Sequence, residues 1–325
     1  MLKVLKAVNL SGTNPGVSKV HFRIGLKAIE YRYNHRDEST LSHFLKITSG
    51  DVAPKLPLFM LSFLKRRRRE RAMREARIDD VAWTRELASY NFTRVLNADE
   101  RERLKALVIL FIAEKPINGA GNLNIDNGAR LAIAIQACML ILNLDLDWYK
   151  SWTEVIIYPG EFVTRHEEVD EAGVVHVVED SMSGESWAHG TVVLSWADVM
   201  QAGRADGESA YNVVMHEFAH QIDMLNGDAN GFPPLHKDMN REQWAAAFSA
   251  AYDHFCQRVD AWEETVIEEY AAENPAEFFA VISEAFFETP LAVRDEYPDV
   301  YAQLTLFYRQ DTAARVLAAV SGRVQ

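Results

Sequence analysis

The segment His216-Glu217-Phe218-Ala219-His220 constrains this chain most, because its spacing is meaningful only on a helix. Two histidines four positions apart on a helix lie on one face, where both imidazoles can bind the same metal ion. Asn212 is suited to cap the start of such a helix, and Gly227 follows where a C-terminal cap belongs. Glu217 would then face the open side of the ion and take a proton from its water. The alternative is two surface histidines on an acidic helix.

A catalytic zinc ion needs a third protein ligand and leaves its fourth position to water. No further histidine follows at the short spacing that some zinc peptidases use, so we expect a carboxylate on a later helix. Asn274 and Pro275 mark such a helix start, and Glu277 lies in its first turn. Glu277 either closes a capping box onto Asn274 or binds the metal. Glu284, two turns along the same face, and His236 are the competing third ligands.

The charge is distributed unevenly along the 325 residues, whose net charge is −13. Residues 1–59 carry +5, residues 60–77 carry +6, and the remaining residues carry −24. So acidic a remainder repels nucleic acid, which argues against direct binding of DNA or RNA. The arginine run at 65–77 is interpreted as a solvated basic helix or arm, or as a contact for an acidic partner or membrane surface.

The composition also limits the cell compartment. Cys138 and Cys256 are the only cysteines. They are too few for a disulfide framework or a four-cysteine zinc site, and they suit a reducing compartment such as the cytoplasm. The longest apolar stretch, 131–142, is too short to span a membrane.

The pattern along the chain predicts helices, then a small sheet, then helices, which is an α+β arrangement. Residues 1–59 have no sustained periodicity, and we expect a poorly ordered extension, with Met60 as an alternative start. Residues 60–79 follow as the basic helix or arm, and 80–325 form the main domain. Within it, the expected buried helices are 104–113 and 129–144, and the expected strands are 155–158, 173–178 and 191–194. Strand 191–194 precedes the histidine helix, either at the sheet edge, where it could pair with an extended peptide, or in the core.

The chain resembles the Mlc titration factor A family of bacterial zinc peptidases over roughly residues 80–325. The resemblance depends on shared motifs, namely Ile157-Tyr158-Pro159 with Phe162, Gly184-Glu185-Ser186, Leu194-Ser195-Trp196 with Asp198, residues 216–223, Asn226-Gly227-Asp228 with Gly231 and Pro233, Pro275-Ala276-Glu277, Ser283-Glu284 and Phe286-Phe287. It implies a mainly helical, zincin-like fold of the gluzincin type, with a small mixed sheet whose edge strand precedes the metal-binding helix.

The same resemblance implies the site and its chemistry. The ligands of one Zn²⁺ per chain would be His216, His220 and Glu277, with Glu217 as the base. Tyr270 matches the family's active-site tyrosine and would donate a hydrogen bond to the oxyanion. Its alternative role is that of a core tyrosine at a helix edge. The implied protein is a cytoplasmic peptidase of aminopeptidase type that acts on small peptide substrates and binds the Mlc repressor of sugar-uptake genes.

Two further questions stay open at the level of sequence. The protein could instead be a regulatory protein that sequesters a transcription factor, with the zinc site and hydrolysis secondary. Asp223, three residues after His220, either accepts a hydrogen bond from a ligand imidazole or serves a salt bridge or the helix end.

Overall fold

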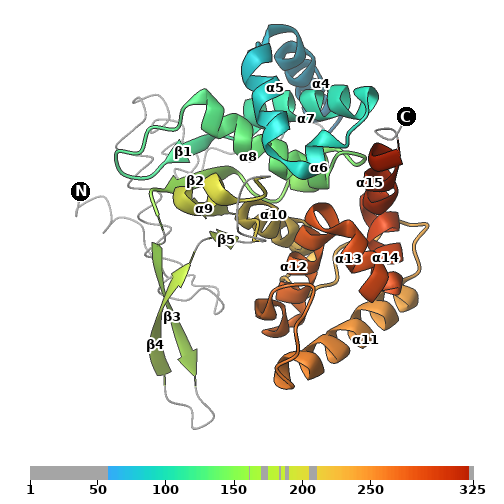
Figure 1. Ribbon diagram of the computed structural model, residues 1–325. Coiled ribbons are helices and arrows are strands. Elements are labelled where there is room, and N and C mark those ends of the chain that lie inside the picture. The colour runs from blue at the N-terminus through green and yellow to red at the C-terminus, as the bar shows by residue number, and fades with distance from the viewer. Residues whose placement is uncertain are drawn as a thin grey trace. The chain divides into compact units, whose positions relative to one another are not determined.

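The computed structural model describes residues 58–160, 162–169, 175–182, 184–186, 190–204 and 211–321, and helices dominate it (Figure 1). The expected extension at 1–59 lies outside these ranges except for its last two residues, which begin the first helix of the described part of the chain. Residues 66–162 and 181–321 belong to one compact unit, which carries the site. Strands β3 (Phe162–Val169) and β4 (Val175–Met182) pair with each other in a two-stranded sheet.

The first half of the main unit consists of helices that precede and flank the sheet. They are α4 (Leu58–Glu75), α5 (Asp80–Ser89), α6 (Asn91–Arg94), α7 (Ala98–Glu114), α8 (Asn127–Leu140) and the short 3-10 helix η1 (Leu146–Tyr149). The expected helices 104–113 and 129–144 correspond to α7 and α8, although α8 ends at Leu140 and continues as turns. The arginine run is helical as far as Glu75, and Arg69 of α4 forms ion pairs with Glu114 of α7 and Asp147 of η1.

The main sheet has the strand order β1-β2-β6-β5. Its strands are β1 (Ile117–Gly119), β2 (Glu154–Tyr158), β6 (Thr191–Ser195) and β5 (Gly184–Ser186). The first three run parallel, with Ile157 of β2 beside Leu194 of β6, whereas β5 is antiparallel to β6. The apolar runs of β2 and β6 agree with this arrangement, because parallel strands are usually covered on both faces.

The expectation that the strand before the histidine helix lies at the sheet edge is wrong. β6 lies between β2 and β5, and every residue of β6 is buried. The three-residue strand β5 takes the outer position. Its pairing with β6 satisfies the backbone groups that an extended peptide would otherwise use. The expected strand 173–178 begins outside the described residues and continues into β4.

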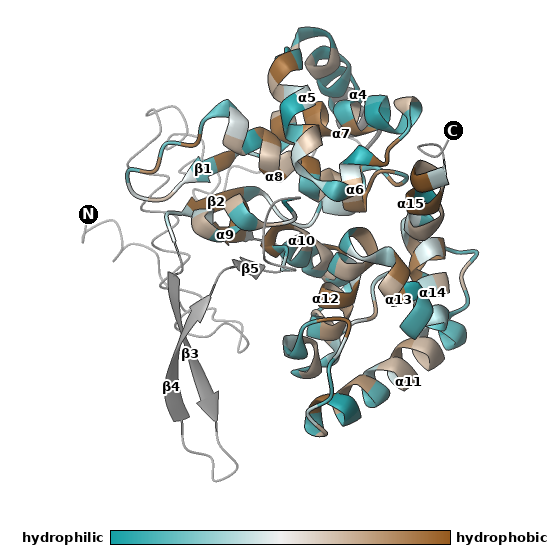
Figure 2. Ribbon diagram, viewed as in Figure 1, coloured by the Kyte–Doolittle hydropathy of each residue, from teal (hydrophilic) through white to brown (hydrophobic). Residues whose placement is uncertain are grey.

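The second half of the main unit is helical and contains the most apolar segments. It comprises α9 (Trp196–Gln201), α10 (Val213–Asp223), η2 (Met224–Asn226), α11 (Arg241–Asp260), η3 (Glu269–Ala272), α12 (Pro275–Glu288), α13 (Pro290–Glu296), α14 (Pro298–Tyr308) and α15 (Thr312–Ser321). Figure 2 shows apolar residues on both α10 and α12. Every residue of α10 is buried, and α10 packs against α8, α12, β5 and β6.

Aromatic packing fixes the side of α10 that faces the core. Phe218 lies 5.1–5.7 Å, between ring centroids, from Phe111, Tyr149 and Trp152. Contacts between aromatic rings stabilise the fold beyond the area that they bury, so they favour one orientation of α10 about its axis. The orientation turns His216 and His220 toward α12. Within the described residues, no helix is both long and apolar enough to cross a membrane.

Candidate active site

The histidine helix α10 begins where the sequence predicts it. Asn212 is the N-cap, and its Oδ1 accepts a hydrogen bond of 2.9 Å from the backbone N–H of Met215. This satisfies one of the donors that a helix leaves unpaired at its start. His216 and His220 follow at one-turn spacing, and their rings lie 4.8 Å apart in an edge-to-face arrangement. Both are buried, so they are not the surface histidines of the alternative interpretation.

Helix α12 also begins at its expected cap. Asn274 Oδ1 accepts hydrogen bonds from the backbone N–H groups of Ala276 and Glu277, and Pro275 occupies the first helical turn. The Glu277 carboxylate does not turn back toward Asn274. Its Oε2 lies 3.0 Å from His216 Nε2 and 3.2 Å from His220 Nε2. Of the two roles predicted for Glu277, closing a capping box or facing the metal site, the geometry favours the second.

His216, His220 and Glu277 each direct one donor atom to a common point, and these three atoms lie within 4.8 Å of one another. The two Nε2 atoms are 3.1 Å apart. Ligands at zinc distances and tetrahedral angles would be separated by about 3.3–3.4 Å, so a slight expansion of the cluster would accommodate an ion. Two imidazoles and one carboxylate are also a donor set that zinc commonly takes in catalytic sites. The residues fit a metal.

Glu284 is placed differently from the competing ligand that the sequence allows. Its Oε1 lies 2.7 Å from His216 Nδ1, on the side of the ring away from Glu277. His236 is also remote from the cluster, because its Nε2 hydrogen-bonds to the Phe307 carbonyl oxygen at 2.8 Å. Of the three candidates for the third ligand, only Glu277 approaches both Nε2 atoms.

The protonation states of Glu277 and of the two histidines depend on each other. Burial alone would raise the pKa of Glu277, but hydrogen bonds from His216 and His220 outweigh it and hold the pKa well below its usual range. For His216, burial acts to lower the pKa, and hydrogen bonds to Glu277 and Glu284 raise it overall. In the metal-free protein, Glu277 is thus an anion that attracts positive charge to the point where the donors meet.

Glu217 and two tyrosines surround the histidines. Glu217 is buried next to His216 on α10. The Tyr270 ring, on η3, lies 6.1 Å from the His216 ring, and the residue is 46% exposed, which contradicts the alternative of a core tyrosine. Partial burial raises the pKa of Tyr270, and the Glu277 charge raises it further. The phenol is therefore protonated at neutral pH and can donate a hydrogen bond.

Tyr211 is a neighbour of the site that the sequence does not reveal. Its ring lies 5.7 Å from the His216 ring, on the residue just before the α10 cap. Burial raises the pKa of Tyr211, and the carboxylates of Glu217 and Glu284 raise it further. No spacing rule connects a residue before a helix cap with a ligand one turn later, so only the fold identifies it.

Asp223 holds the loop that follows α10 and contacts the start of α12. Its Oδ2 accepts hydrogen bonds of 2.7 Å from the backbone N–H groups of Asn230 and Gly231. Gly231 has φ of +75°, and a Cβ there would lie 2.3 Å from the Pro275 carbonyl oxygen. The end of α10 and the start of α12 are thus held together at a point where only glycine fits. For Asp223, these contacts favour the helix-end role.

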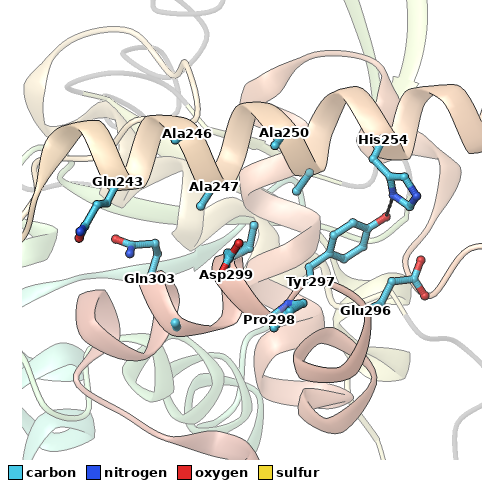
Figure 3. A pocket seen from close by; sticks show the side chains of 13 residues that line it. Gln243, Ala246, Ala247, Ala250, His254, Glu296, Tyr297, Pro298, Asp299 and Gln303 are labelled. Carbon is cyan, nitrogen blue, oxygen red and sulfur yellow. Dashed lines mark hydrogen bonds between the residues drawn. The ribbon is translucent and has the colours of Figure 1, made fainter.

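A separate hollow of about 700 Å³ lies between α11 and the segment 296–303 (Figure 3). Alanines of α11 line one wall, and His254 and Tyr297 form a 3.5 Å hydrogen bond across one end. It includes none of the five residues predicted for the site, so it is distinct from the histidine cluster.

Comparison with known proteins matches residues 64–309 to the family described as glucose-regulated metallo-peptidase M90. The chain belongs to this family. Its relatives include proteins named Mlc titration factor A. The relative from Salmonella arizonae is 37% identical over 68% of this chain and 88% of that protein. The relatives from Salmonella agona and Salmonella paratyphi B are each 36% identical over 68% of this chain and 83% of the relative. The family expected from the sequence motifs is confirmed, and the M90 match includes α10, η3 and α12.

Proposed function

We propose that this metallopeptidase is a zinc-dependent enzyme of aminopeptidase type that works in the cytoplasm and holds one Zn²⁺ per chain through His216, His220 and Glu277. The observation that carries the proposal is the approach of Glu277 Oε2 to both histidine Nε2 atoms, at 3.0 and 3.2 Å. When bound there, zinc would supply Lewis acidity toward water and the scissile carbonyl of a peptide.

The protein's own groups then move the protons and stabilise charge. Glu217 is next to His216 in sequence and buried with it, which suits it to accept a proton from the attacking water. The same carboxyl group would pass that proton to the leaving amine. The protonated Tyr270 hydroxyl would donate a hydrogen bond to the carbonyl oxygen as negative charge develops on it, and removal of such a donor costs on the order of 100-fold or more in rate.

The test is a comparison of Glu217→Gln with the wild-type protein. We expect about one zinc per chain in both, hydrolysis of chromogenic aminoacyl and short peptide substrates by the wild type, and none by the variant. Glu242→Gln is a matched control, because it makes the same chemical change on an exposed part of α11. Full activity of Glu217→Gln, or a wild type without zinc, would contradict the proposal.

A second function is supported by the name of the relatives, Mlc titration factor A. We propose that this chain also binds a repressor of the Mlc type, and that hydrolysis is not needed for this binding. The same Glu217→Gln variant separates the two roles, since it should bind purified Mlc repressor as tightly as the wild type does. Loss of binding in this variant would show that the two roles depend on each other, and lack of binding by the wild type would reject the second role.

A further inference from the structure

Glu284 is a buried carboxylate that the proposed chemistry does not use. It lies seven residues after Glu277 on α12 and is only 3% exposed. Its Oε1 is 2.7 Å from His216 Nδ1, and its Oε2 accepts a 2.7 Å hydrogen bond from the Asn212 backbone N–H. Both carboxylate oxygens therefore have a partner on α10 or at its cap.

The contact with Nδ1 determines which nitrogen of His216 can bind a metal. A neutral imidazole carries one proton, on either Nδ1 or Nε2. The Glu284 carboxylate at Nδ1 holds a proton there. A metal ion would then replace the proton on Nε2, the nitrogen that lies beside His220 and Glu277. A hydrogen bond to a carboxylate also makes the imidazole a stronger base and a stronger ligand.

The two histidines differ in this respect. Among the described residues, Nδ1 of His220 is buried and has no hydrogen-bond partner. His216 alone is held from both sides, by Glu284 at Nδ1 and by Glu277 at Nε2. Of the two histidines, His216 is therefore the one whose ring orientation is fixed at both nitrogens.

The position of Glu284 is itself fixed by the residue that starts α10. Besides donating its backbone N–H to Glu284, Asn212 caps α10 through its Oδ1 and donates from its Nδ2 to Glu288 Oε1 at 2.7 Å. Glu284 and Glu288 are one turn apart on α12, so both residues anchor the start of α10 against the same helix. A shift of α12 would thus move Glu284, the hydrogen-bond partner of His216 Nδ1, together with the ligand Glu277.

We propose that Glu284 is a positioning residue that presents His216 to the metal through Nε2. This inference rests on the proposed zinc site, because positioning has a purpose only where His216 is a ligand. Glu284 does not contact the substrate. Its removal should weaken metal binding, since loss of such an outer carboxylate typically lowers metal affinity by about 10- to 100-fold.

The experiment measures the zinc affinity of Glu284→Gln by competition with a chromogenic chelator. Glutamine has nearly the same shape as glutamate but lacks the charge, and its amide cannot accept from both donors in the same way. Ser283→Ala is the matched control. It is the adjacent buried position on α12 and loses one hydrogen bond, from the Tyr308 hydroxyl at 2.9 Å, without touching His216. We expect the zinc Kd to rise about 10- to 100-fold in Glu284→Gln and to stay within about twofold of the wild type in Ser283→Ala.

A spectroscopic measurement distinguishes positioning from a merely structural role and requires only the wild type. In zinc-loaded, ¹⁵N-histidine-labelled protein, His216 should bind zinc through Nε2 and show a slowly exchanging proton on Nδ1. Zinc on Nδ1 of His216, or an affinity of Glu284→Gln equal to that of Ser283→Ala, would overturn the inference and leave the proposed function intact. A wild type that binds no zinc would overturn both.

Discussion

Replacement of Gly231 by alanine tests whether the loop after α10 sets the position of α12. The new Cβ would lie 2.3 Å from the Pro275 carbonyl oxygen and 2.9 Å from its carbonyl carbon, closer than atoms can approach. Because both contacts are to backbone, the start of α12 has to move or the loop has to open. Overpacking of this kind typically costs about 1–3 kcal/mol. The left-handed conformation at φ of +75° adds about 1–2 kcal/mol for a residue with a side chain.

Gly121→Ala is the control that separates the two contributions. Gly121 has a similar φ of +61°, but a Cβ there would meet nothing within 4 Å. We therefore expect Gly121→Ala to lose only the conformational part, about 1–2 kcal/mol. Gly231→Ala should lose roughly 2–5 kcal/mol in the free energy of unfolding. The difference corresponds to a further decrease of about 2–12 °C in Tm for a domain of this size.

The assay is chemical unfolding of the metal-free proteins, followed by a zinc titration of both variants. Since Pro275 begins the helix that carries Glu277, Gly231→Ala should also bind zinc more weakly than Gly121→Ala. Equal stability and equal zinc affinity of the two variants would refute the reasoning, because they would mean that the loop yields without moving α12.

Three further outcomes follow from the site. Tyr270→Phe should lower kcat by about 100-fold and spare KM and zinc content, as expected for a contact made mainly in the transition state; a raised KM with unchanged kcat would assign Tyr270 to substrate binding. Glu277→Ala should abolish tight zinc binding in a chelator competition, whereas His236→Ala should leave the zinc Kd unchanged. Burial raises the pKa of Glu288 from 4.5 to about 7, so the folded state holds this proton more tightly than the unfolded state does. Stability should then fall as pH rises from about 4.5 to 7, by about 3 kcal/mol at most, and Glu288→Gln should lack that part of the loss in urea unfolding curves.

The sequence predicted the helices of the site well because their signals are local. Asn212 and Asn274 are helix caps that bond to backbone groups two or three residues away, so a short segment contains all the information. The spacing of His216 and His220 likewise fixes their common face before any tertiary contact forms.

The features that were predicted wrongly, or could not be predicted, are those that depend on contacts between segments far apart in the sequence. The resemblance implied that β6 lies at an edge, and the sequence itself left edge and core open. The neighbour that covers β6, β5, is only three residues long and has no recognisable alternation. Glu277 and Glu284 share one face of α12, and the sequence could not tell which of them would approach Nε2 and which Nδ1. That choice depends on how far α12 slides along α10 when the two helices pack, which only the tertiary structure determines.

The separation of the donor atoms along the chain has a consequence for biosynthesis. Glu277 lies 61 residues after His216, so at 5–20 residues per second the ribosome adds it about 3–12 s later. During that interval the nascent chain offers two imidazoles on an isolated α10, with neither the carboxylate that completes the cluster nor the one that orients His216. The third donor arrives only when α12 has been made and has docked. Tight metal loading is therefore expected only after α12 has docked against α10.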